Sequence, residues 1–417
     1  MLKTPIARGV ALATLGATLA IPTMAHAAFV DDSKVNLELR NFYYNSDNRS
    51  VASDKQSKSE EWGQGFILRA ESGYTEGTVG FGVDALGLMG IKLYSSEDTA
   101  GTGLMPSAFG NEAPDDFSSL GLTAKAKISK TVLKIGTIEP KNMAISRSDS
   151  RLLPQTFKGG QIISNEIDGL TLDAGYLTEE NDRDSTNYED LKFSGKGGAT
   201  GDKPDDFLFA GATYSFTKDL KGAYYYSNLE EVYKQHSFNL IHVLPLGEDQ
   251  SLKTDLRYAR STDDGSSSVD NKAFGAMVTY SITGHSFGLG YQKMSGDTGF
   301  AYTGASTDPY LVNYVMLSAD FANADEKSWQ ARYDYNFAAM GIPGLTFMTR
   351  YVTGDDFGAG GNSKEWERNT DIGYVFQEGT LKNLGVKWRN GTYRSSNNSD
   401  KDIDQNRLIV SYTIPLM

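Results

Sequence analysis

The chain has 417 residues, no cysteine, and 53 acidic against 40 basic residues, which gives a formal net charge of −13 at pH 7. The lack of cysteine excludes a disulfide framework and Cys-ligated metal sites, and the acidic balance argues against nucleic acid as a partner. Tyrosine and phenylalanine are common, at 23 and 20 residues, which suits a β-rich exported protein.

Residues 1–27 have the pattern of a secretory signal peptide that is removed from the mature chain. Two basic residues, Lys3 and Arg8, precede an apolar run at 10–21, and a small-x-small cleavage pattern follows at 25–27. The apolar run is too short to span a bilayer. Beyond it the sequence contains no apolar stretch of eighteen or more residues, which excludes transmembrane helices.

From residue 28 onward, apolar and polar residues alternate with a period of two, which is typical of strands with one apolar and one polar side. In the first run, for example, Leu39 faces one side while Glu38 and Arg40 face the other. We predict eighteen strands, at 35–44, 62–74, 78–88, 119–129, 131–138, 161–167, 169–178, 206–216, 221–229, 232–243, 250–262, 271–282, 285–294, 328–338, 344–353, 366–377, 381–392 and 405–415.

The connections between these runs alternate in length. Short turns such as Ser129-Lys130 alternate mostly with long polar segments, at 45–61, 89–118, 138–160, 179–205, 295–327, 354–365 and 393–404. An even strand count with short turns at one end and long loops at the other is typical of a bacterial outer-membrane barrel. The sequence therefore predicts an all-β fold in which residues 28–417 form one transmembrane antiparallel β-barrel. A two-layer β-sandwich is the alternative with the same alternation.

Basic residues inside the alternating runs should point into the lumen, because Arg or Lys facing lipid near mid-membrane costs about 2 to 4 kcal/mol. The inward cations are Arg40, Arg69, Lys125, Lys127, Lys134, Lys253, Arg257, Arg332, Arg350, Lys387, Arg389 and, near a strand end, Arg407. Acids such as Glu38 and Asp371 also point inward, so some cations are expected to be paired.

Closing the barrel pairs the last strand with the first, because an open edge is not tolerated in lipid. This closure gathers five cations on one wall: Arg350, Lys387, Arg389, Arg407 and Arg40. A column of cations in a low-dielectric constriction raises the local concentration of anions and guides them through. We therefore expect small organic anions as permeants.

A long interruption at 138–160 carries both charge signs, a proline and the pair Gly159-Gly160. An insertion of this length is unusual in a compact domain unless it is functional, and we predict that it folds into the pore and narrows it. Its candidate eyelet residues are Arg147, Asp149, Arg151 and Lys158. The residues expected to pack the loop against the wall are Leu152, Leu153, Pro154 and Phe157.

Several stretches closely resemble the OprD-type porins of Pseudomonas and relatives, among them GTVGFGVDALGLMGIKL (77–93), LGLTAKAKISKTVLKIGT (120–137), SRLLPQTFKGGQI (150–162), SWQARYDYNFA (328–338) and NRLIVSYTIPL (406–416). The resemblance implies an eighteen-stranded, substrate-specific outer-membrane channel for small carboxylate-bearing nutrients. It also implies constriction by the third and seventh extracellular loops, here 138–160 and 295–327. The ladder of cations that it implies carries over to Arg40, Lys387, Arg389, Arg407, Arg350 and Arg368.

Two features depart from this pattern. Strict alternation puts Arg368 on the side of Ile372 and Tyr374, so Arg368 either lies outside the membrane zone or is turned inward by a bulge. The chain also ends in Met417, whereas such barrels commonly end in an aromatic residue that the insertion machinery reads. Within the family, the resemblance favours channels for aromatic or cyclic monocarboxylates, and channels for basic amino acids and peptides are the alternative.

One motif suggests another class of function. The pentapeptide Gly284-His285-Ser286-Phe287-Gly288 matches the nucleophile elbow of hydrolases, which requires a strand, a sharp turn and a helix. Because alternation resumes at once with Phe287 and Leu289, we predict a hairpin turn. A remote alternative is an outer-membrane hydrolase that uses Ser286, and another is a structural barrel with a plugged lumen.

The sequence predicts neither a cofactor nor a metal site. His236 and His242 share a strand face without a further ligand at suitable spacing, and the acidic loop tips lack the ligand spacing of an EF-hand. The expected partners are outer-membrane lipid and small organic anions. The expected state of the chain is a monomer or a weak homotrimer.

Overall fold

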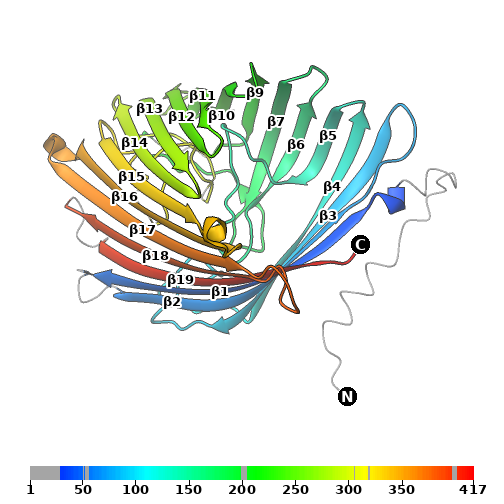
Figure 1. The fold of residues 1–417 in the computed structure, drawn as a ribbon, viewed down its shortest axis with the longest axis horizontal. Coiled ribbons are helices and arrows are strands. Elements are labelled where there is room, and N and C mark those ends of the chain that lie inside the picture. The colour runs from blue at the N-terminus through cyan, green and yellow to red at the C-terminus, as the bar shows by residue number, and fades with distance from the viewer. Residues whose placement is uncertain are drawn as a thin grey trace.

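The computed structural model describes residues 29–49, 51, 56–198, 204–304, 306–317, 320–396 and 402–417, and the predicted signal peptide lies outside these ranges. Antiparallel strands follow one another around a ring, which β1 and β19 close by pairing from Asn36 with Pro415 to Arg49 with Asp402 (Figure 1). Within the described ranges, no helix is both long enough and apolar enough to cross a membrane.

The strands are β1 (Lys34–Arg49), β2 (Lys58–Glu71), β3 (Gly80–Tyr94), β4 (Asp116–Ile128), β5 (Thr131–Ile138), β6 (Thr156–Ser164), β7 (Leu170–Asn181), β8 (Glu189–Asp190), β9 (Phe207–Ser215), β10 (Leu220–Leu229), β11 (Tyr233–Gly247), β12 (Gln250–Asp263), β13 (Asp270–Ile282), β14 (His285–Ser295), β15 (Lys327–Asn336), β16 (Leu345–Phe357), β17 (Ser363–Val375), β18 (Gly385–Ser395) and β19 (Asp402–Pro415). Two short 3-10 helices, η1 (Phe337–Met340) and η2 (Ala359–Gly361), lie in connections. The two-residue β8 pairs only with the end of β7, while β7 pairs directly with β9. The wall is therefore a closed barrel of eighteen strands, as predicted.

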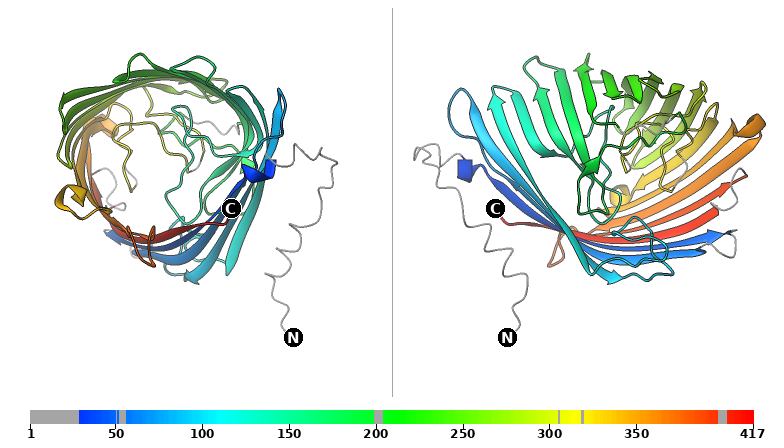
Figure 2. Two further views of the ribbon diagram at one scale, coloured as in Figure 1. Left: turned by 45° about the vertical axis from the view of Figure 1, so that its right-hand side comes forward. Right: turned by 180° about the vertical axis from the view of Figure 1, so that it is seen from behind.

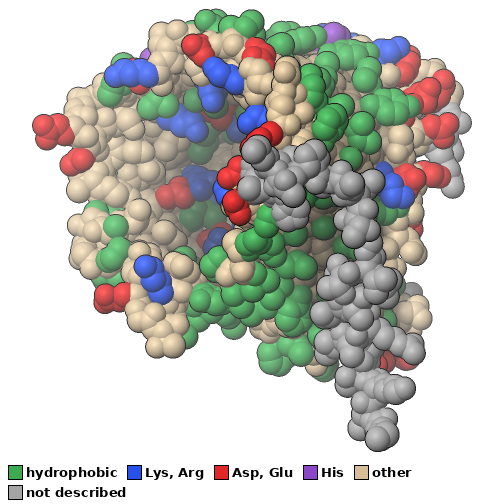
Figure 3. Space-filling model, turned by 90° about the vertical axis from the view of Figure 1, so that its right-hand side faces the viewer, with side chains coloured by type: hydrophobic (Ala, Val, Ile, Leu, Met, Phe, Trp, Pro, Cys, Tyr) green, Lys and Arg blue, Asp and Glu red, His purple; other side chains and the backbone are tan. Residues whose placement is uncertain are grey.

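The outer wall is apolar because successive side chains of each strand face lipid and the lumen in turn. On this face Leu120 and Leu289 are each 70% exposed, which would be unfavourable in water and is expected against lipid. Figure 3 shows hydrophobic side chains spread over the outside, with charged side chains at the rim and in the hollow. The alternation in sequence thus sorts the side chains between lipid and lumen.

The third loop, residues 139–155, leaves the wall and lies inside the ring (Figure 2, left). Leu152 and Leu153 are buried in one cluster with Phe42 of β1 and Ile67 of β2. A side chain at Gly65 would place its Cβ only 2.9 Å from the Leu152 carbonyl oxygen, so the close approach of loop and wall depends on this glycine. The predicted packing of Leu152 and Leu153 against the wall is confirmed.

The loop ends earlier than predicted, because β6 already begins at Thr156. Lys158 consequently lies in a strand, where its ammonium is 2.5 Å from Glu179, and not in the loop. The register of β6 against β7 shifts between Lys158 and Gly159. Gly159 has a φ of +157°, and a Cβ there would lie 2.1 Å from the Tyr176 carbonyl oxygen. The glycine pair in the sequence therefore marks a β-bulge and not a loop.

We expect Gly65→Val to push the third loop off β2 and to destabilise the barrel by about 1–3 kcal/mol, the usual cost of overpacking. The measurements are urea unfolding in detergent and single-channel conductance, which should rise as the loop moves. Gly87→Val is the control, because its nearest neighbour is the Leu68 Cβ at 3.6 Å. Equal conductance in both variants would show that this contact does not hold the loop.

Candidate functional site

Two loops far apart in the sequence meet inside the barrel. The third loop (139–155) and the seventh loop (296–326) are joined where the Asp308 N–H donates to the Ser146 carbonyl oxygen at 2.9 Å. Both loops come from the long-loop end of the barrel, and Figure 2 shows loop segments inside the ring. The predicted pair of inward loops is thus brought together in one constriction.

The fourth loop, residues 182–206, also contributes to this constriction, which the sequence analysis missed. Its described part forms backbone hydrogen bonds to the seventh loop, from Ser194 N–H to Tyr302 O at 3.0 Å and from Lys196 N–H to Phe300 O at 3.1 Å. No pattern in the sequence predicted this pairing, because the segment shows no alternation that distinguishes it from a solvated loop.

A chain of ion pairs fastens the third loop to the wall. Glu139 lies 2.9 Å from both Arg69 of β2 and Arg147, and Asp149 lies 3.2 Å from Arg147 and 2.7 Å from Arg40 of β1. Burial alone would raise the pKa of Asp149, but the charges of Arg40 and Arg147 hold it below its ordinary value. Arg40 and Arg69 of the wall are therefore paired with acids of the loop that they hold.

Arg151 of the third loop and Arg407 of β19 lie near the ring of Tyr44. Their guanidinium carbons are 5.3 and 5.5 Å from the ring centroid, which is within the range of a cation–π contact. Arg407 donates to Gln405 at 2.6 Å and to the Met316 carbonyl oxygen at 3.0 Å. Burial, helped by the nearby charge of Arg183, lowers the pKa of Arg151 to about 10.

Carbonyl groups of the seventh loop accept hydrogen bonds from arginines on separate strands. Besides Arg407, Arg350 of β16 donates to the Tyr314 carbonyl oxygen at 3.0 Å, and Arg257 of β12 donates to that of Leu311 at 2.9 Å. Backbone carbonyls carry no net charge, so these bonds satisfy the donors without cancelling the positive charge. The seventh loop therefore covers these arginines without cancelling the charges of Arg350 and Arg407, whereas Arg257 is also paired with Asp255.

The other predicted lumenal cations divide into paired and unpaired groups. The paired ones and their acids are Arg389 with Asp371, Arg332 with Asp334, Arg257 with Asp255, and Lys125 and Lys134 with Asp84. Among the residues that the structure describes, no carboxylate forms an ion pair with the remaining predicted cations, which are Lys127, Lys253, Arg350, Lys387 and Arg407. The same holds for Arg151 of the third loop and for Arg183 of the fourth loop, which the sequence analysis did not single out.

A cavity of about 440 Å³ lies beside the third loop and brings five predicted residues together, Arg40, Asp149, Arg151, Lys387 and Arg389. Three positions of the sequence-based ladder, Arg40, Lys387 and Arg389, therefore line one cavity. Arg407 lies opposite Arg389 in the register of β18 and β19 but is buried, and Arg350 donates to the seventh loop.

Arg368 does not belong to this surface. It is exposed on the outer face of β17, because its chain neighbours Glu367 and Asn369 are both fully buried toward the lumen. The register of β17 with β18 continues past Arg368 without a shift. The one shift between β16 and β17 lies between Asp355 and Phe357 of β16, nearer the start of β17 than Arg368. The bulge that would have turned Arg368 inward is absent from this described pairing.

Comparison with known proteins identifies the architecture. The sequence model of the OprD family, described as an outer membrane porin family, matches residues 27–416. The chain belongs to the OprD family. It is 37% identical over 416 residues to Porin D of Pseudomonas aeruginosa, covering 93% of this chain and 92% of that protein.

Solved structures of this family share the fold. The crystal structure of Pseudomonas aeruginosa OpdQ is 57% identical, with a TM-score of 0.85, and covers 94% of this chain and all of that one. That of Pseudomonas aeruginosa OccK7 (OpdD) is 54% identical, with a TM-score of 0.83, and covers 93% of this chain and all of that one. OprD-family proteins are channels of the bacterial outer membrane and not enzymes.

The position of Ser286 agrees with a channel and not with a hydrolase. It lies within β14, where its hydroxyl contacts the Ser281 hydroxyl at 2.8 Å, and the neighbouring His285 ring bonds the Tyr333 hydroxyl. No helix follows the turn, because β14 begins at His285 itself. The hydrolase alternative is therefore wrong: Gly284 lies in a hairpin turn, and the rest of the pentapeptide begins strand β14.

Two carboxyl groups meet where the seventh loop joins β15. Glu326 is fully buried beside Glu365 of β17, and one of its oxygens accepts bonds from the Asn323 backbone and side chain at 3.0 and 2.8 Å. Burial, together with the Glu365 charge, raises the pKa of Glu326 to about 9. Its other oxygen has no hydrogen-bond partner, so a proton there can bridge to Glu365.

This pair should make the anchor of the seventh loop sensitive to pH. In the anchored loop Glu326 keeps its proton up to about pH 9, whereas a released loop would lose it near the ordinary value of 4.5. Anchoring is therefore complete below pH 4.5 and weakens as pH rises through this window. We expect the noise of the open-channel current to grow between pH 7 and 9.

Glu326→Gln should flatten this pH dependence, because an amide does not ionise. Asp325→Asn is the matched control, since Asp325 is the exposed neighbour in the same turn, and it should behave like the wild type. A pH dependence that persists in Glu326→Gln would contradict the assignment.

Proposed function

We propose that this porin takes up small carboxylate-bearing nutrients along a lumenal row of cations. The row consists of Arg350, Arg389, Arg407, Lys387 and, from the third loop, Arg151. The observation that carries the proposal is the state of Arg407, which is 1% exposed and has no acidic partner among the described residues. A buried cation of this kind is costly unless an anion arrives.

In the proposed mechanism, the arginines exchange a neutral hydrogen-bond acceptor, a loop carbonyl, for a charged one, the carboxylate of the substrate. In the structure, Arg350 and Arg407 donate to carbonyl oxygens of the seventh loop. A carboxylate forms a charge-assisted hydrogen bond that is about twice as strong as a neutral one, and it accepts two guanidinium N–H groups at once. An entering carboxylate would therefore displace the loop carbonyls and move from one arginine to the next.

Aromatic side chains beside the row favour aromatic or cyclic monocarboxylates as substrates. Tyr44 lies close to Arg151 and Arg407, and the ring of Tyr310 lies 4.1 Å from the Arg257 guanidinium. Tyr44 thus offers a planar substrate a stacking surface next to Arg151 and Arg407 of the row, and Tyr310 offers one next to Arg257, which lies outside the row. The first candidate class is therefore benzoate-like anions.

A porin for basic amino acids and peptides is the second candidate. It would need acids in the constriction, where Asp308 of the seventh loop is the best placed. Burial raises the pKa of Asp308, and the Tyr314 hydroxyl donates to it at 2.6 Å. A carboxyl group that binds protons more readily attracts cations less strongly, which weakens this candidate.

The two candidates are separated by an uptake panel of benzoates, basic amino acids and dicarboxylates in a strain that lacks other specific porins. The proposal requires benzoate uptake to depend on this protein and lysine uptake to be independent of it. Lysine uptake without benzoate uptake would establish the second candidate instead.

Arg407→Gln should lower the anion preference of the channel and weaken its block by benzoate about tenfold, since a hydrogen bond to a charged group contributes about 1.5–3 kcal/mol. Planar-bilayer reversal potentials and block titrations measure both effects. Lys130→Gln is the control, because Lys130 is a largely exposed cation in a short turn, near Asp168. Unchanged block in Arg407→Gln would exclude Arg407 from the permeation path.

A further inference from the structure

Arg368 lies on the lipid-facing side of the barrel, within the apolar band. Along β17, the next outward residue toward the extracellular end is Trp366, which stacks on Tyr351 at 5.6 Å. Toward the periplasmic end the outward residues include Ile372 and Tyr374. Arg368 therefore lies about 7 Å along the strand below the tryptophan, given the rise of a strand. Its depth corresponds to the outer leaflet.

The Arg368 guanidinium has few polar neighbours there. Its single described hydrogen bond goes to the Thr392 hydroxyl at 3.5 Å, and no described carboxylate forms an ion pair with it. By contrast, Lys234, an outward cation at the extracellular end of β11, has Asp264 at 2.6 Å. An unpaired arginine in the apolar band is destabilising, so an anionic group of the membrane would be a favourable partner for it.

A groove leads away from Arg368 across the outer wall. It has a volume of about 660 Å³ and is lined mainly by apolar and aromatic groups of β13 to β17, including Leu289, Ala331, Tyr333 and Tyr351. Ala331, the small residue among these outward side chains, leaves the floor of the groove low, so the groove can hold an acyl chain. The apolar lining and the cation at its edge match the two ends of an anionic lipid.

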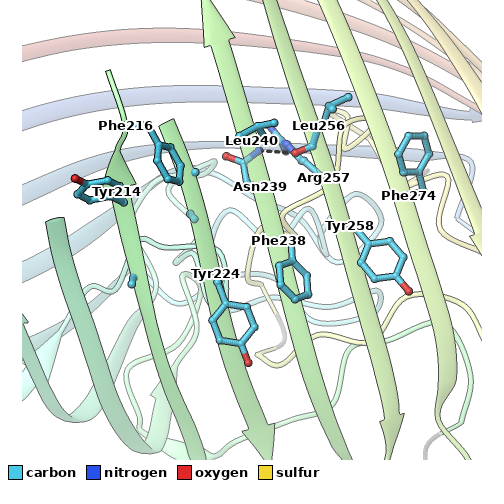
Figure 4. A pocket seen from close by; sticks show the side chains of 13 residues that line it. Tyr214, Phe216, Tyr224, Phe238, Asn239, Leu240, Leu256, Arg257, Tyr258 and Phe274 are labelled. Carbon is cyan, nitrogen blue, oxygen red and sulfur yellow. Dashed lines mark hydrogen bonds between the residues drawn. The ribbon is translucent and has the colours of Figure 1, made fainter. Parts of the chain in front are cut away.

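A second groove on the same wall provides an internal comparison. It spans β9 to β13, has a volume of about 500 Å³, and is lined by rings such as Tyr224, Phe238, Tyr258 and Phe274 (Figure 4). Among the described residues that line this groove, the one cation is Arg257, whose guanidinium lies in the lumen and bonds Asp255. This groove has the apolar part of the arrangement without an outward charge.

We propose that the groove at Arg368 binds lipopolysaccharide of the outer leaflet. One acyl chain lies along the groove, and a phosphate of the glycolipid headgroup accepts two N–H groups of Arg368. The guanidinium fork matches the geometry of a phosphate, and the side chain can extend toward the headgroup region while its stem stays in the apolar band. Charge complementarity and depth together select this lipid over a neutral one.

Native mass spectrometry of the mature protein in detergent, titrated with deep-rough lipopolysaccharide, tests the proposal. The wild type should retain one lipid, and Arg368→Gln should weaken its binding about tenfold, as expected for the loss of a charged hydrogen-bond donor. Arg368→Lys should be intermediate, because a lysine keeps the charge and loses the fork. Ala331→Trp should also weaken binding by filling the groove.

Lys234→Gln is the charge-matched control, and it should bind lipopolysaccharide like the wild type. Arg368 is exposed, so its variants should fold, which heat-modifiable gel mobility verifies. Three outcomes overturn the proposal: unchanged binding in Arg368→Gln, equally tight and equally sensitive binding of phosphatidylglycerol, or a wild-type dimer that Arg368→Gln dissociates. The last result would assign the groove to a second copy of the chain.

Discussion

The exclusion of charge from the lipid face governs this structure. Because the outer wall is apolar and the backbone bonds are closed into a ring, nearly all strand cations must find their partners inside. The lumen meets this requirement in two ways, by acids on the wall and by loops that fold inward. Which of the two a given cation receives decides whether it holds the structure together or remains available to a permeant.

The two main inward loops deal with the arginines differently. The third loop brings Glu139 and Asp149, which cancel the charges of Arg40 and Arg69 and fasten the loop to β1 and β2. The seventh loop brings carbonyl oxygens, which occupy the donors of Arg350 and Arg407 and leave their charge. The third loop is therefore held to the wall by ion pairs, and the seventh loop by hydrogen bonds that leave the arginine charge uncancelled.

Alternation in the sequence was sufficient to predict the eighteen strands, the closure and the inward face, because lipid imposes a period of two on every strand. The same rule placed Arg368 outside, against the ladder that the family resemblance implied. The partner of each cation was not predictable, because it depends on the height of each acid in the wall and on the path of the loops. Arg183 was missed for this reason, since it reaches Ser148 and Ser150 only through the fold of the fourth loop.

The central claim is that a carboxylate replaces a seventh-loop carbonyl on an unpaired arginine. A crystal structure of the protein with bound benzoate tests it most directly. The account predicts the carboxylate within hydrogen-bond distance of Arg407 or Arg350, with the Met316 or Tyr314 carbonyl oxygen moved away from its present distance of 3.0 Å. Benzoate bound elsewhere in the lumen, with both carbonyl contacts intact, would contradict it.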